Sequence, residues 1–94
     1  MKFHVTVEGG HAADVTILPG SVGQFTGQVV SADYGTGDIV EGLQDQNGLR
    51  GKVSLDGYLA DFTATLSDNA ISGKLSYGWF FSKKFSGIRS DNEV

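Results

Sequence analysis

Residues 49–77 read LRGKVSLDGYLADFTATLSDNAISGKLSY, and this stretch decides the fold. Apolar and polar residues alternate through three short runs, which is typical of half-buried β-strands. The runs are separated by Asp56-Gly57 and Asp68-Asn69, and such pairs of residues form tight turns between antiparallel strands. The stretch therefore predicts three consecutive antiparallel strands, at about residues 49–55, 58–66 and 70–77.

The two turns also fix how these strands pair, because turn length sets the register of a hairpin. With two residues in each turn, the apolar pairs are Leu55 with Tyr58, Val53 with Ala60, Leu66 with Ile71 and Phe62 with Leu75. The opposite face pairs Lys52 with Asp61, and opposite charges are favourable there. Both hairpins place the same residues of the middle strand inward, so the three strands form one sheet with one apolar face.

Similar alternation continues on both sides of this stretch, at about 2–8, 12–18, 24–32 and 38–46, and in a last strand that ends near Ser86. The loop Gly9-Gly10-His11 is predicted to place Val5 opposite Val15. Eight short sequential strands rich in glycine indicate an all-β antiparallel meander that closes, or nearly closes, into a β-barrel, because closure removes exposed sheet edges. A two-sheet β-sandwich, with a short helix near 38–46, is the alternative.

Composition limits the possible classes of protein. A chain of 94 residues forms one domain, which we expect over residues 1–88, followed by a frayed polar tail over 89–94. The chain has no Cys and no visible signal peptide, which favours a cytoplasmic protein, although a leader removed by cleavage would leave the same N-terminus. No apolar run has the length of a membrane span, so we expect a soluble protein. The net charge of −4 argues against a surface that tracks nucleic-acid phosphates.

The orientation of Glu41 depends on the turn at Asn47-Gly48. A two-residue turn leaves Glu41 in solvent, whereas a three-residue loop buries Ile39 and Leu43 and points Glu41 inward. The apolar pattern favours the inward orientation, and a bulge at Gly42 would reverse it. An inward carboxylate is a candidate ligand group, or the general base of an acid–base enzyme.

The inward face predicts a small-molecule binding protein without catalysis. Large side chains alternate on it with small ones, and an eight-stranded barrel is either filled by side chains or holds one small ligand. The expected ligand is apolar or amphipathic, and the candidate binding residues are Glu41, Tyr58, Phe62 and Tyr77. The same alternation describes a filled barrel and a hollow one.

A cluster of aromatic residues follows the third strand of the central stretch. Three adjacent aromatic residues cannot all point inward from one strand, and exposed aromatic clusters often mark interfaces. Trp79, Phe80, Phe81 and Phe85 are therefore the candidate interface of a homodimer or larger homo-oligomer, and Trp79 is also a candidate platform for a sugar. His4, His11 and Asp14 lack the spacing of a metal site, so no metal or cofactor is expected.

Overall fold

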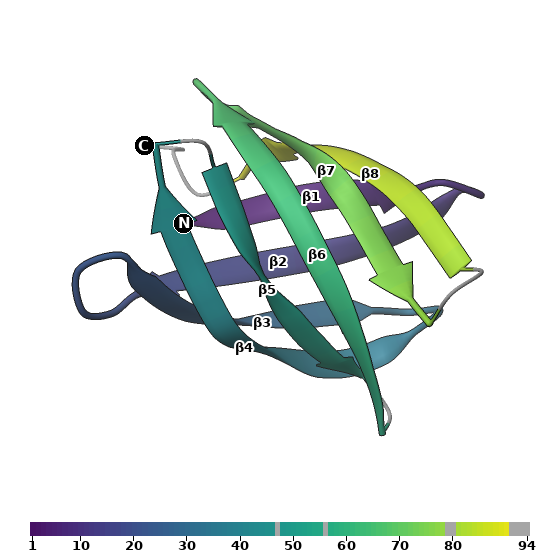
Figure 1. Ribbon diagram of the computed structural model, residues 1–94. Coiled ribbons are helices and arrows are strands. Elements are labelled where there is room, and N and C mark those ends of the chain that lie inside the picture. The colour runs from purple at the N-terminus through teal and green to yellow at the C-terminus, as the bar shows by residue number, and fades with distance from the viewer. Residues whose placement is uncertain (47, 56, 79–80, 91–94) are drawn as a thin grey trace.

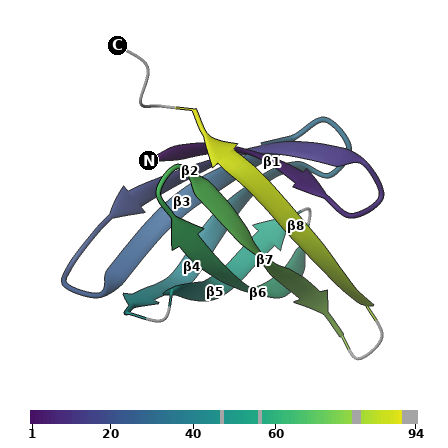
Figure 2. The same cartoon turned by 90° about the horizontal axis from the view of Figure 1, so that it is seen from above.

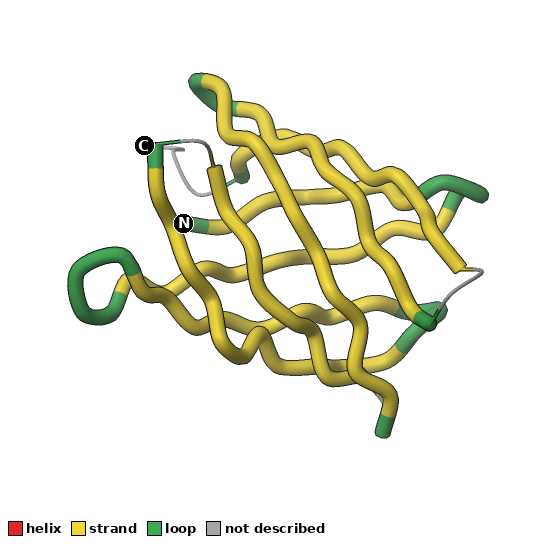
Figure 3. Tube along the Cα trace, in the orientation of Figure 1, coloured by secondary structure: helices red, strands yellow, loops and turns green. Residues whose placement is uncertain are grey.

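The computed structural model describes residues 1–46, 48–55, 57–78 and 81–90 of the chain (Figure 1). The described residues form strands and short connections, with no helix among them (Figure 3). None of them therefore belongs to a helix that could cross a membrane. The eight strands are β1 (Lys2–Val7), β2 (His11–Pro19), β3 (Gln24–Ser31), β4 (Gly35–Asp45), β5 (Gly48–Leu55), β6 (Tyr58–Ser67), β7 (Ala70–Tyr77) and β8 (Phe81–Arg89).

The strands close into a barrel. Each strand pairs antiparallel with its neighbour in sequence, and β1 pairs with β8, with Val5 opposite Gly87. Strand β8 lies between β7 and β1 and pairs with both of them (Figure 2). The predicted all-β meander barrel is confirmed, and the alternatives of a two-sheet sandwich and of a helix near 38–46 are wrong.

The registers of the central stretch are confirmed residue by residue. Leu55 faces Tyr58 and Val53 faces Ala60 in one hairpin, and Leu66 faces Ile71 in the next. The first hairpin differs from its prediction by two residues, because Val5 lies opposite Ala13 rather than Val15. A shift of two residues keeps every side chain on its face, and Phe3, Val5, Val7, Ala13 and Ile17 are all buried.

Strand β4 contains a bulge that neither predicted register included. Ile39 pairs with Val53, but Leu43 pairs with Arg50, so the register shifts by one residue between Val40 and Leu43. Glu41 takes a positive φ of 52° at this point. The bulge buries Ile39 and leaves Leu43 and Glu41 exposed. The inward orientation predicted for Glu41 is therefore wrong, because the extra residue of the bulge turns its side chain outward.

Large aromatic side chains fill the core at the end of the barrel where β1 begins. Phe3 is only 2% exposed there, and Phe25 packs against Phe62 with 6.3 Å between ring centroids. Glycines on the inward face give the large rings space: a Cβ at Gly73 would lie 2.8 Å from Cζ of Phe85, and one at Gly51 would lie 3.1 Å from Cε1 of Phe62. Aromatic residues that cover glycines on the next strand allow the sheet to curve.

The C-terminal strand continues past the expected domain boundary. Arg89 is the last residue of β8, and its N–H donates to the carbonyl of Asn69 at 2.6 Å. The Ser90 N–H donates to the carbonyl of Lys2 at 2.8 Å. Arg89 and Ser90, the first residues of the expected polar tail, are thus held against the barrel, and residues 91–94 lie outside the described residues.

Candidate ligand cavity

The interior of the barrel holds a cavity of about 540 Å³. Small-molecule sites in proteins typically measure roughly 300–1,000 Å³. Most of the lining side chains are aliphatic or aromatic, and they come from all eight strands. They include Val5, Val15, Ile17, Val29, Ile39, Leu49, Val53, Ala60, Phe62, Ile71, Leu75 and Phe85.

The cavity opens at one end of the barrel, which we term the mouth. The mouth is where β1, β3, β5 and β7 end and where the strands after them begin, on the right in Figure 1. Tyr58, Tyr77 and Phe81 line the cavity there and are 59%, 42% and 40% exposed. Phe3 and Phe25, at the other end, do not line it. The filled end therefore forms a floor, and the exposed aromatic residues mark the entrance.

Tyr58 and Tyr77 form the aromatic side of the mouth. Their rings meet edge to face, with centroids 5.3 Å apart and planes at 88°. This arrangement suits the charge distribution of aromatic rings. No hydrogen bond to either hydroxyl occurs within the described part of the chain, so both phenols are free to meet solvent or a bound molecule at the entrance.

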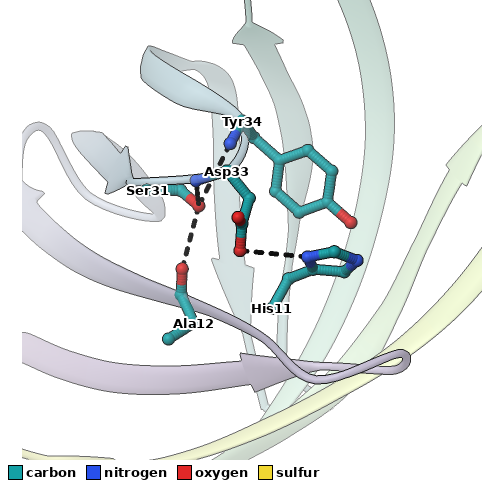
Figure 4. A network of polar contacts seen from close by, with 5 residues as sticks. All are labelled: His11, Ala12, Ser31, Asp33 and Tyr34. Carbon is teal, nitrogen blue, oxygen red and sulfur yellow. Dashed lines mark hydrogen bonds and ion pairs between the residues drawn. The ribbon is translucent and has the colours of Figure 1, made fainter.

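A polar group occupies the mouth where β2 begins and where β3 joins β4. His11 Nδ1 lies 3.0 Å from Asp33 Oδ2, and the ring of His11 lies 5.0 Å from that of Tyr34 (Figure 4). Asp33 and Tyr34 line the cavity. The polar group therefore brings a carboxylate, a phenol and an imidazole to one side of an apolar space.

Buried Ser31 holds the loop that carries this group. Its Oγ donates to the carbonyl of Ala12 at 2.8 Å and accepts from the N–H groups of Asp33 and Tyr34 at 3.2 and 3.3 Å (Figure 4). The hydroxyl thereby satisfies three backbone groups near the end of β3. Ser31 fixes Asp33 and Tyr34 relative to β2, where His11 begins the strand.

Three of the four predicted binding residues line the cavity. Phe62 lies in its wall, and Tyr58 and Tyr77 lie at the mouth. Glu41 does not line it. The Glu41 side chain is 70% exposed on the outside of the barrel, where Oε2 lies 3.5 Å from Nζ of Lys52.

The predicted interface residues divide into two groups. Phe81 and Phe85 both line the cavity, so these rings belong at least partly to the interior. Trp79 and Phe80 lie outside the described residues. The aromatic cluster expected on the surface is therefore divided, with Phe85 half-buried and Phe81 at the mouth.

The two histidines contact separate carboxylates. His4 Nδ1 lies 3.0 Å from Asp14 Oδ1 on the outer face of the first hairpin, whereas His11 contacts Asp33 at the mouth. Within residues 1–46, 48–55, 57–78 and 81–90, no three side chains of His, Asp or Glu gather as they would around a metal ion.

Sequence reasoning missed Lys83 and Asp33. Lys83 lies on the same face of β8 as the cavity-lining Phe81 and Phe85. The alternation Phe-x-Lys-x-Phe carried that signal. Asp33 carried none, because only the fold brings a loop carboxylate to His11.

Comparisons of the chain with protein-family models, with curated proteins and with solved structures find no match.

Proposed function

We propose that this protein binds one small apolar or amphipathic molecule inside its barrel and that binding, not catalysis, is its function. The observation that carries the proposal is the apolar cavity of about 540 Å³ with one filled end and one exposed aromatic end. A molecule entering at the mouth would exchange water for contact with aliphatic and aromatic side chains, which is favourable at roughly 25 cal/mol per Å² of apolar surface removed from water.

The shape of the interior supports a ligand of limited size. Eight strands leave space for side chains or for one small guest. Small side chains on the inward face, among them Ala13 and Ala60, keep the space open, and Phe62 lies in its wall. This arrangement favours a slender molecule with an apolar body, inserted from the mouth.

Titration with N-phenyl-1-naphthylamine, a neutral dye that fluoresces in apolar surroundings, tests the proposal. We expect a saturable rise in fluorescence with one dye per barrel. The Ala60→Phe variant, which adds a ring to the cavity wall, should lose most of this signal. Leu59→Phe is the matched control, because Leu59 is the neighbouring residue, is 51% exposed and does not line the cavity.

Folding of both variants is checked by circular dichroism and thermal unfolding, because an added ring can overpack a core. If Ala60→Phe does not fold, Ala13→Leu provides a second and smaller filling of the same space. Equal dye binding by a folded filling variant and by Leu59→Phe would overturn the proposal.

Self-association remains an alternative proposal from the sequence, and native mass spectrometry tests it. A co-purified small molecule on a monomer supports the binding function. A dimer without bound small molecules would support an interface at the aromatic cluster instead. The acid–base alternative that used an inward Glu41 is withdrawn, because Glu41 lies on the outer surface.

A further inference from the structure

We propose that the ligand is an amphipathic anion whose acidic head, such as a carboxylate, lies at the mouth beside Lys83 while its apolar body fills the cavity. This inference rests on the proposed binding function and adds the chemical class of the ligand. Two observations support it. The first is the position of the Lys83 ammonium group, and the second is that the nearby carboxylates contact other groups.

Lys83 lies on the inward face of β8. It pairs with Leu75 across β7, and the residues two positions away on either side are Phe81 and Phe85. All three of these neighbours line the cavity. Because side chains alternate along a strand, Lys83 points to the same side as they do, at the level of the mouth.

The ammonium group of Lys83 lies beside the ring of Phe81 and beside the turn that contains Gly9. Nζ is 5.3 Å from the ring centroid of Phe81, close enough for a cation–π contact. Nζ of Lys83 and Nε2 of His11 each lie 3.5 Å from the point where a Cβ on Gly9 would stand. The two nitrogens therefore flank the turn between β1 and β2, where they could both meet one head group.

The nearby carboxylates are occupied by other groups. Asp33 Oδ2 contacts His11 Nδ1 at 3.0 Å, and Glu8 Oε1 accepts from the backbone N–H of Lys84 at 3.2 Å. No carboxylate of the described residues lies within 4.0 Å of Lys83 Nζ. An ammonium group without an acidic partner beside the entrance of an apolar cavity attracts an anion, and hydrogen bonds between charged groups are stronger than those between neutral groups.

The experiment compares three probes with the same ten-carbon chain: decanoate, 1-decanol and decyltrimethylammonium. Each displaces N-phenyl-1-naphthylamine from the wild-type protein and from Lys83→Met, which keeps the stem and removes the charge. We expect Lys83→Met to weaken the binding of decanoate about fivefold and to leave the binding of 1-decanol unchanged. The decanoate effect should shrink in 0.5 M NaCl, because salt screens a partly exposed charge.

Lys84→Met is the matched control, because it removes the same charge from the adjacent, outward-facing position. It should change decanoate binding less than twofold. Comparing each probe across variants removes the intrinsic difference in hydrophobicity between the three heads.

The outcomes separate this inference from the function beneath it. If neither the dye nor 1-decanol binds, the binding function itself fails. If 1-decanol binds and decanoate responds equally to Lys83→Met and Lys84→Met, only the assignment of an anionic head is overturned. Stronger binding of decyltrimethylammonium than of decanoate to the wild type would overturn it in favour of a cationic head beside Asp33.

Discussion

Phe25 and Phe62 meet edge to face, with their ring planes at 61°, and this contact closes one end of the barrel. Phe62 lines the cavity, whereas Phe25 lies behind it and does not. The pair thus marks a boundary of the cavity, with one ring in its wall and the other behind that wall. The depth of any binding site depends on this boundary.

Phe25→Ala should therefore be costly. Removing a buried Phe ring leaves a void that the surroundings fill only partly, and we expect a loss of about 3–5 kcal/mol in the free energy of unfolding. Urea denaturation followed by circular dichroism measures this loss. Leu59→Ala, on the outer face, should cost less than about 1 kcal/mol. Equal losses for the two variants would show that Phe25 does not close the core.

Gly73 should not tolerate a methyl group. A Cβ there would collide with the carbonyl oxygen of Thr63 and lie 2.8 Å from Cα of Ala64, neither of which can rotate away. We expect Gly73→Ala to cost about 1–3 kcal/mol. Gly20→Ala is the control, because a Cβ on Gly20 would lie 3.5 Å from its nearest atom, the carbonyl oxygen of Gln24, which is an ordinary contact. Thermal unfolding should show that this variant changes the free energy of unfolding by less than about 1 kcal/mol. A stable Gly73→Ala protein would contradict the close strand packing.

Because of the bulge in β4, we expect the wild type and two variants at position 41 to follow an unusual order of stability. A positive φ costs a residue with a side chain about 1–2 kcal/mol, whereas the exposed ion pair with Lys52 contributes roughly 0.2–1 kcal/mol. Glu41→Gly should thus be neutral or stabilising, and Glu41→Val should be the least stable of the three. In a regular strand Val is favoured over Gly. If denaturation experiments found Glu41→Val to be more stable than Glu41→Gly, the bulge would be disproved.

Ser31 should be essential to the polar side of the mouth. Ser31→Ala leaves the Ala12 carbonyl and two N–H groups without their partner, and an unsatisfied buried group costs about 1–3 kcal/mol. We expect this loss in urea denaturation, together with changed NMR shifts for Tyr34 and His11. Ser82→Ala, at an exposed position of β8, is the control and should change neither. Unchanged Tyr34 shifts in Ser31→Ala would mean that the loop holds its shape without the hydroxyl.

The sequence was most informative where turns are short. The two-residue turn Asp68-Asn69 allows a single register, with Leu66 opposite Ile71, and the structure shows this pairing. Longer connections left choices: the first hairpin places Glu8 rather than His11 in its turn, which moves the pairing by two residues. The bulge at Glu41 was weighed only at its neighbour Gly42, because alternation alone does not show where an extra residue enters a strand.

The candidate site was less predictable than the fold. Phe62 and Tyr77 followed directly from alternation, since both share the inward face. The free space beside them did not follow, because a filled barrel and a hollow one have the same pattern. The polar side of the mouth depends on His11 meeting Asp33 across 22 residues of chain. The antiparallel register of β2 and β3, with Asp14 opposite Val30, brings them together.

The most direct test of the hollow, ligand-binding barrel is a methyl NMR titration with 1-decanol. We predict saturable shift changes for methyl groups that line the cavity, such as those of Val53, Ala60 and Leu75. Exposed methyl groups of Leu18 and Val30 should stay unchanged. Saturation without any change at the lining methyl groups, or no saturable change at all, would contradict the account.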